Sequence, residues 1–350
     1  KHHDGFALWP SAYTEHDIAS SSYKDGKGDL VKEVAEAAKA HGLEFGVYLS
    51  PWDRNRSDYG EESYIRYYRN QLKELFTGYG PVFEMWFDGA NGGDGYYGGA
   101  NEERKIDRQN YYDWPTTLKM VDSMQPPVLF FSDAGPDLRW VGNERGIGGE
   151  THWNTITTDT LYAGKAGIEE LLQSGTKDGK SWIPAEVNTS IRPGWFYHAS
   201  EDSLVRSPEN LFELYLTSVG RGSTLLLNIP PDRRGLFHEN DVASLRGFRK
   251  ILDSVFAENL AEKATATATP VRGDKPIYAA DKVLDGDAET YWATNDGVTT
   301  GSLELSWDAP QTLNYISLQE YIKLGQRVAA FTVSVWEDGA WKEVQNQTTI

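Results

Sequence analysis

The chain has 350 residues, of which 39% are hydrophobic, so it can bury a large core, and disorder is excluded as its main state. Its 52 acidic and 34 basic residues give a net charge of −18, which disfavours nucleic acids and anionic membrane surfaces as partners. Cysteine is absent, which excludes disulfides and thiolate metal sites, whereas 12 Trp and 19 Tyr supply rings of the kind that stack on sugars.

Helical patterns alternate with short apolar runs through most of the chain. We expect helices at 30–40, 64–77, 111–125, 168–174, 208–219 and 239–256, with strands at 44–49, 82–87, 128–131, 182–187 and 223–228. Strands separated in this way by helices indicate right-handed crossovers and a parallel sheet, and five or more units favour a (β/α) TIM-like barrel. An open doubly wound sheet is the alternative, but no Gly-rich phosphate loop follows any strand.

The pattern changes after residue 260. A low-complexity Ala/Thr stretch at 264–270 is followed by alternating strands at 303–307 and 331–336, which indicates an all-β domain. We therefore expect an α/β catalytic barrel over 1–260 and a β-sandwich over 261–350. Because only five or six barrel units precede residue 260, we expect the first barrel strands to lie upstream of Lys1. The last strand also looks interrupted, so both domains are expected to be incomplete.

One carboxylate stands at the end of a predicted buried strand. Trp86-Phe87-Asp88-Gly89 closes the run 82–87, and the carboxyl ends of barrel strands carry the chemistry in this fold. Asp88, flanked by aromatic rings, is thus a candidate nucleophile or base. The alternative is a turn or N-cap aspartate, because Asp-Gly is also a common turn signal.

Glycoside hydrolysis generally needs a second carboxylate. The foremost candidate is Glu144, in the glycine-bounded loop 139–146 that follows the strand 128–131. Its alternative role is an ion pair with a neighbouring arginine. Asp133 and Glu186 are competing second carboxylates.

Polar and aromatic residues near other strand ends are candidate ligand contacts. His2 and His3 are interpreted as a pair of hydrogen-bond donors to substrate hydroxyls at a strand end, with a metal pair as the weaker alternative. Tyr48 and Trp52 follow the strand 44–49 and line the same face, unless they only pack in the core.

Four segments together resemble glycoside hydrolase family 29, the retaining α-L-fucosidases: His2-His3-Asp4-Gly5-Phe6, Trp86-Phe87-Asp88-Gly89, Trp140-Val141-Gly142-Asn143-Glu144 and residues 189–197. The resemblance implies that Asp88 is the nucleophile and Glu144 the general acid/base. It also implies that His2 and His3 bind fucose hydroxyls, that Tyr48 neighbours the ring and that Trp195 lies near the methyl group or ring face. Trp52 and Trp86 are further candidate contacts with the substrate. Family members take a further His and an acidic residue from strands that precede the His-His motif.

The Glu144 loop looks like that of the subfamily that prefers α-1,3/1,4-linked fucose in branched glycans. The resemblance therefore implies a retaining exo-α-L-fucosidase acting on Lewis-type glycans, without a cofactor for catalysis. Alternatives are a broad-specificity exo-α-L-fucosidase that also cleaves α-1,2 linkages, and a non-catalytic carbohydrate-binding protein. Fucosylated oligosaccharides or glycoconjugates are the expected partners, with no membrane span, and the expected location is periplasmic or secreted.

The second domain carries its own resemblance. Val283-Leu284-Asp285-Gly286-Asp287, followed by Thr290-Tyr291-Trp292, resembles the discoidin-like (F5/8 type C) sandwich, a carbohydrate-binding-type module. The resemblance implies a structural calcium near this turn, with Asp285 and Asp287 as oxygen ligands for a hard cation. A plain turn with two solvated carboxylates is the alternative.

Overall fold

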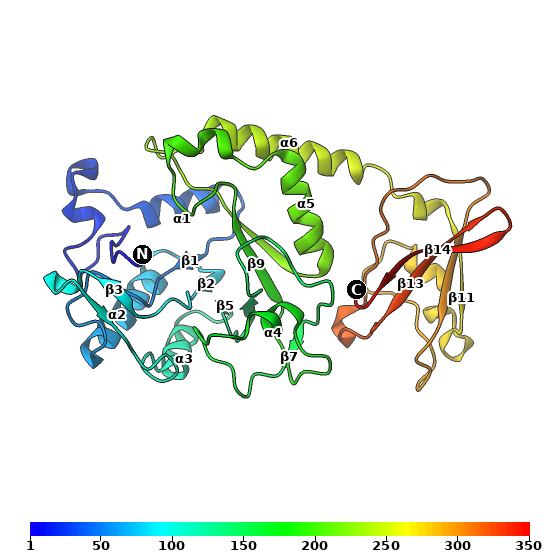
Figure 1. Cartoon of the computed structure of the whole chain (residues 1–350), viewed down its shortest axis with the longest axis horizontal. Coiled ribbons are helices and arrows are strands. Elements are labelled where there is room, and N and C mark those ends of the chain that lie inside the picture. The colour runs from blue at the N-terminus through cyan, green and yellow to red at the C-terminus, as the bar shows by residue number, and fades with distance from the viewer. The chain divides into compact units, whose positions relative to one another are not determined.

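The computed structural model describes residues 1–350 and divides into two compact units. The first unit contains residues 1–143 and 154–186, and the second contains residues 144–153 and 187–350. The chain passes between the units at 143/144, 153/154 and 186/187, and the last of these points falls inside strand β9. Figure 1 labels the main helices and strands along the chain.

A parallel sheet with the strand order β1-β2-β5-β6-β9-β10 organises the chain. Its strands are β1 (Val47–Tyr48), β2 (Glu84–Trp86), β5 (Leu129–Ser132), β6 (Leu138–Trp140), β9 (Ala185–Ser190) and β10 (Thr224–Asn228). Within the first unit, each neighbouring pair from β1 to the start of β9 is parallel. Strands that pair in chain order, with helices in the connections, follow the winding of a (β/α) barrel, which confirms the predicted fold class.

Four helices belong to the first unit: α1 (Leu30–Ala40), α2 (Glu62–Gly78), α3 (Trp114–Met124) and α4 (Glu169–Ser174). Asp29 caps α1 by accepting a hydrogen bond from the Lys32 N–H. Helix α2 buries one face, including Tyr64, Tyr68 and Leu72, in the same core cluster as the strand residues Val47 and Met85. The helical periodicity of these apolar positions is what made α2 predictable.

Two predicted segments differ from the structure. The single strand expected at 182–187 is two strands, because β8 (Ser181–Trp182) pairs antiparallel with β7 (Thr155–Ile156) before β9 enters the parallel sheet. Pro184, which has no N–H to donate, separates them. The loop expected at 139–146 begins inside strand β6, where Arg139 is completely buried and donates to the backbone carbonyls of Leu172 and Ile183. A buried arginine gives no apolar strand signal.

A short hairpin follows the Asp88 loop. Strands β3 (Gly93–Gly95) and β4 (Glu102–Arg104) pair antiparallel in a glycine-rich segment. Gly92 and Gly93 take positive φ angles of 70° and 125°, which explains the need for glycine at this turn into β3.

In the second unit, helices α5 (Pro208–Ser218) and α6 (Glu239–Val255) pack against each other. Asn228, at the end of β10, donates through its side chain to the hydroxyl of Ser190 at the end of β9, so the two strands end at the same level. Arg192, two residues later, is fully buried and donates to the fully buried Asp241 of α6 at 3.1 Å. The start of α6 is thereby attached to the chain that leaves β9.

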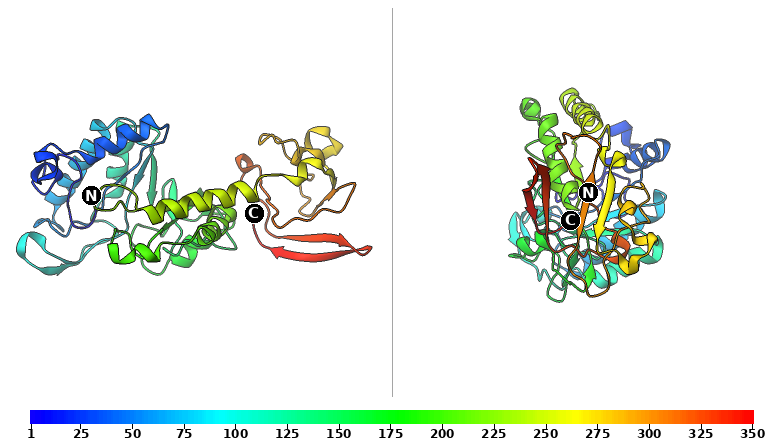
Figure 2. Two further views of the ribbon diagram at one scale, coloured as in Figure 1. Left: turned by 90° about the horizontal axis from the view of Figure 1, so that it is seen from above. Right: turned by 90° about the vertical axis from the view of Figure 1, so that its right-hand side faces the viewer.

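After α6 the helical segments are all short 3-10 turns, drawn as coiled ribbons in Figure 2. Strands β11 (Thr265–Thr269) and β12 (Ser302–Ser306) form one antiparallel pair, and β13 (Phe331–Glu337) and β14 (Ala340–Gln347) form another. The all-β character expected after residue 260 is therefore confirmed. None of the helices is both long and apolar enough to cross a membrane.

Replacing Asp241 with alanine is expected to lower the free energy of unfolding by about 3 kcal/mol, because it removes the fully buried partner of Arg192 and leaves only the partly exposed Asp202 to pair with the buried guanidinium. Urea unfolding of the full chain, followed by tryptophan fluorescence, measures the change. The control is Asp253→Ala, whose partner Arg249 is 74% exposed, and it should cost less than about 1 kcal/mol. Equal effects of the two variants would contradict the expected role of the buried pair.

Candidate active site

Asp88 lies two residues beyond β2 in the first unit, where both of its carboxylate oxygens are held. The Tyr48 hydroxyl donates to Oδ2 at 2.7 Å, and the Ala90 N–H donates to Oδ1 at 2.6 Å. The Asp88 side chain remains 22% exposed, so it is oriented and still reachable. Burial, reinforced by Asp88, raises the pKa of Tyr48 above its ordinary value, so the phenol stays protonated and keeps donating.

His2 and His3 lie beside the same carboxylate, although the residues around them form a turn and not the expected strand end. Because the Gly5 N–H donates to the His2 carbonyl, the backbone reverses and the two rings come within 3.9 Å of each other. His3 Nε2 lies 3.8 Å from Asp88 Oδ2. Two adjacent histidines thus share one side of the site, which an extended strand would have prevented.

The hydrogen bonds around His3 define its tautomer. Ser50 Oγ donates its proton to the Trp52 carbonyl at 2.8 Å, so its contact of 2.7 Å with His3 Nδ1 requires a donating Nδ1–H. Burial lowers the pKa of His3 to about 4, so the ring is neutral at pH 7 and Nε2 is an acceptor. This differs from the donor role expected from the sequence. Burial also lowers the pKa of His2.

The tryptophans of the first unit are fixed by their ring N–H groups. Trp86 stacks on Phe131 with ring centroids 4.1 Å apart and donates to Glu186 Oε1 at 2.8 Å. Trp52 donates to the Tyr97 hydroxyl at 2.9 Å, and its ring lies 5.1 Å from that of His3. The sequence did not indicate Ser50 and Tyr97, because a serine or a tyrosine that orients a ring distant in the chain carries no local sequence signal.

The competing carboxylates are enclosed. Asp133 Oδ2 accepts from the Gly164 N–H at 2.7 Å and occupies the space beside Gly89, where a Cβ would come within 1.9 Å of it. Burial raises the pKa of Asp133 to about 6. Glu186 is 4% exposed and is the acceptor for Trp86, which leaves Asp88 as the oriented and reachable carboxylate of this group.

The other two predicted residues contact each other in the second unit. Glu144 lies in an exposed loop, and its backbone carbonyl accepts from the Thr189 hydroxyl at 2.9 Å. Trp195 Nε1 donates to Glu144 Oε2 at 3.4 Å. The Glu144 carboxylate is therefore near the chain that leaves β9, with an indole edge beside it.

Asp285 and Asp287 form a local turn far along the second unit. The Asp285 carboxylate accepts from the Thr290 hydroxyl at 2.8 Å and from the Asp287 N–H at 3.0 Å. No group of three or more His, Cys, Asp or Glu side chains is arranged to hold a metal ion. Both Asp285 oxygens are thus occupied by local donors, and calcium at this turn stays a prediction.

Two family models match the chain: alpha-L-fucosidase over residues 1–254 and F5/8 type C domain over residues 263–350. The alpha-L-fucosidase 1 of Arabidopsis thaliana is 39% identical over 354 residues, covering 100% of this chain and 67% of that protein. The chain spans about two thirds of the length of the curated plant relatives that it matches.

Solved structures show the same similarity over the whole chain. A glycoside hydrolase 29 family member from an unknown rumen bacterium is 45% identical with a TM-score of 0.84, and the match covers 59% of that chain. A glycoside hydrolase 29 fucosidase from Ruminococcus gnavus, solved in complex with fucose, is 29% identical with a TM-score of 0.83, and the match covers 74% of that chain.

Glu84 of β2 generates a prediction about pH. Burial, reinforced by Glu186, raises the pKa of Glu84 to about 7, and its Oε1 is buried without a hydrogen-bond partner. The folded chain therefore binds this proton more tightly than the unfolded chain, so stability is lost as pH rises from about 4.5 through 7. The free energy of unfolding of Glu84→Gln minus that of the parent should therefore be higher at pH 8 than at pH 4, by up to about 3 kcal/mol.

Urea unfolding at pH 4, 6 and 8 measures this difference. The 70% exposed Glu36 provides the control, because Glu36→Gln should show no such pH-dependent change relative to the parent. A difference between Glu84→Gln and parent that is constant from pH 4 to 8 would show that the carboxyl group of Glu84 does not titrate in the expected range.

Proposed function

Because this chain belongs to the alpha-L-fucosidase family, glycoside hydrolase family 29, with an F5/8 type C domain from residue 263, we propose that it is a retaining exo-α-L-fucosidase. The observation that carries the proposal is the carboxylate of Asp88, oriented by Tyr48 and Ala90 and still exposed beyond the end of β2. A nucleophile in this fold needs this combination of orientation and access.

The proposed reaction is a double displacement. Asp88 attacks the anomeric carbon of fucose and forms an ester bond as the glycosidic carbon–oxygen bond breaks, while Glu144 gives its proton to the leaving oxygen. Glu144 then takes a proton from water, and the resulting hydroxide displaces Asp88 and releases fucose. Two inversions at the same carbon retain the anomeric configuration.

The neighbouring side chains have proposed roles in holding the sugar and the nucleophile. Tyr48 positions the carboxylate, and His3, neutral with Nε2 as acceptor, takes a hydrogen bond from a fucose hydroxyl. His2 is proposed to bind a second hydroxyl. The rings of Trp52, Trp86 and Trp195 are proposed to contact the apolar faces of the sugar, since their N–H groups already have partners.

We propose that terminal α-1,3/1,4-linked fucose in branched glycans is the preferred substrate. The β3–β4 hairpin supports this proposal, because it follows the nucleophile loop and Tyr97, between its two strands, accepts a hydrogen bond from the proposed sugar contact Trp52. A broad-specificity fucosidase that also cleaves α-1,2 linkages is the second candidate. The region from residue 261 is proposed to act as a separate module, and the chain to work in the periplasm or outside the cell.

Fucose release from a branched Lewis-type trisaccharide tests the two proposed carboxylates. Asp88→Asn and Glu144→Gln should each lower kcat by at least about 100-fold, because each removes a group that takes part in bond making or proton transfer. The exposed Asp122→Asn on α3 provides a matched control with parental activity. Parental activity in Asp88→Asn would overturn the proposal.

A nitrophenyl fucoside separates the two roles, because its leaving group needs no proton. Glu144→Gln should release a burst of nitrophenol equal to the enzyme concentration and then slow down, since it lacks the base for the second step. Asp88→Asn should show no burst. The rate on the trisaccharide relative to an α-1,2-linked fucoside then decides the linkage preference.

A further inference from the structure

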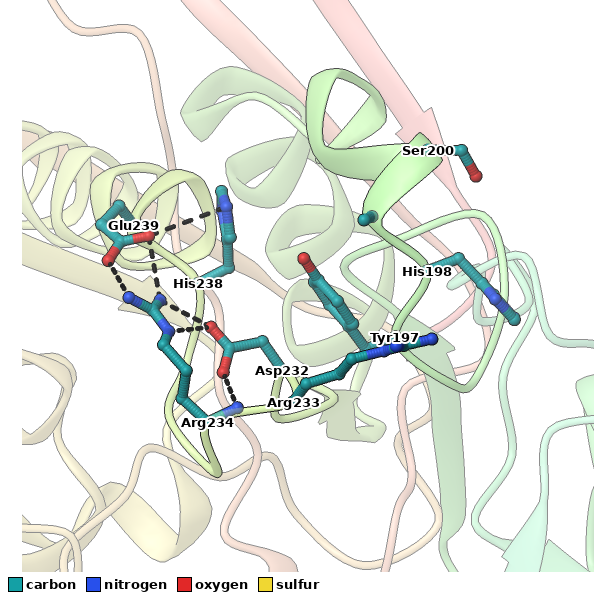
Figure 3. A pocket seen from close by; sticks show the side chains of 9 residues that line it. Tyr197, His198, Ser200, Asp232, Arg233, Arg234, His238 and Glu239 are labelled. Atoms are coloured by element: carbon teal, nitrogen blue, oxygen red, sulfur yellow. Dashed lines mark hydrogen bonds and ion pairs between the residues drawn. The ribbon is translucent and has the colours of Figure 1, made fainter.

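The second unit contains a cavity of about 650 Å³ between the loops that leave β9 and β10 and the start of α6 (Figure 3). The first loop supplies Tyr197 and His198, and the second supplies Arg233 and Arg234. His238, the N-cap residue of α6, completes this part of the lining. The Asn228 side chain donates to the Trp195 carbonyl at 3.0 Å, so the first loop is attached to the end of β10.

The acidic side chains of this cavity already have cationic partners. Arg234 donates to Asp232 at 2.6 Å and to Glu239 at 2.9 Å, and His238 Nε2 lies 3.4 Å from Asp202. Figure 3 shows the Arg234 network as one connected group on its side of the cavity. Each of these carboxylates therefore has a cationic partner other than Arg233.

Arg233 differs from its neighbour. Its side chain forms no hydrogen bond or ion pair with any residue, and in Figure 3 it extends away from the Arg234 network toward the side where His198 lies. Ser200 also lines the cavity. In a chain with a net charge of −18, the exposed Arg233 lines the cavity without a carboxylate partner, which suits it to an anion such as a carboxylate or a sulfate.

Tyr197 supplies a rigid aromatic surface in the cavity. The guanidinium of the buried Arg192 lies 4.8 Å from its ring centroid, and its hydroxyl donates to Asp202 at 3.3 Å. The ring also stacks against His238 at 6.2 Å. A tyrosine held in this way can support a sugar ring beside the cation.

We propose that this cavity binds an acidic sugar, bearing a carboxylate or a sulfate, in the leaving group of the substrate, with Arg233 and His198 on the anion and Tyr197 on the ring. The proposal rests on the proposed function, because the acidic sugar is taken to belong to the glycan that carries the fucose. Within the second unit, Trp195 donates to Glu144 and is separated from Tyr197 by one residue. The same loop therefore contacts the proposed acid/base and lines the cavity.

The experiment compares kcat/KM for a neutral Lewis-type trisaccharide with that for its sialylated and its sulfated forms, at low and at high salt. In the parent, one or both acidic forms should be favoured over the neutral form, and salt should reduce this preference. Arg233→Gln should lower the acidic-to-neutral ratio by about tenfold, the loss expected for a charge-assisted hydrogen bond. The two acidic substrates show whether a carboxylate or a sulfate is preferred.

The exposed Arg246 of α6 gives the matched control, because Arg246→Gln removes the same charge outside the cavity and should leave the ratio unchanged. An unchanged ratio in Arg233→Gln would overturn the proposal, as would an equal fall in both variants, which would indicate only the overall charge of the protein.

Calorimetric titration of fucose-free sialyllactose and sulfated lactose gives a second measurement that needs no turnover. Binding of either sugar by the parent, weakened in Arg233→Gln, would support the proposed binding site. If the same protein released no fucose, the proposed function would fail while the binding site remained supported. Fucose release without such binding would retain the fucosidase and reject the acidic subsite.

Discussion

The hydrogen bond from Tyr48 to Asp88 is the interaction on which the candidate site depends. A carboxylate beyond the end of a parallel strand must be reachable and yet hold one orientation if it is to act as a nucleophile. Tyr48 meets this requirement from the neighbouring strand β1, and the Ala90 N–H holds the second oxygen from the loop that follows. The parallel pairing of β1 with β2 is therefore what brings the phenol to the carboxylate.

The sequence predicted the helices well because their signals are local. Helix α1 agrees with the prediction over its whole length, α6 ends one residue before its predicted end, and α2 is longer than predicted by two residues at its start and one at its end. Amphipathic periodicity marks all three helices. The motifs around His2, Asp88 and Glu144 indicated the family resemblance, and the matching family models confirm it. Strand β6 could not be predicted, because a buried arginine satisfied by backbone carbonyls looks polar in the sequence.

The site itself was predicted as a set of residues and not as a geometry. The sequence singled out His3 and Trp52, yet their orientation depends on the hydroxyls of Ser50 and Tyr97, whose partners are 47 and 45 residues away. The adjacency of the His2 and His3 rings depends on a turn that hydrophobic patterning does not encode. Contacts between distant polar groups follow from the fold, so they become visible only after the strands are paired.

The close approach of Gly89 and Asp133 has a consequence for engineering this loop. Any side chain at position 89 would collide with the Asp133 carboxylate, and Gly164 is confined in the same way because a Cβ there would meet the Asn91 amide. Directed evolution of acceptor preference has no usable variation at these two glycines. Libraries would instead have to vary the length and composition of the β3–β4 hairpin, whose exposed residues can change without displacing the nucleophile.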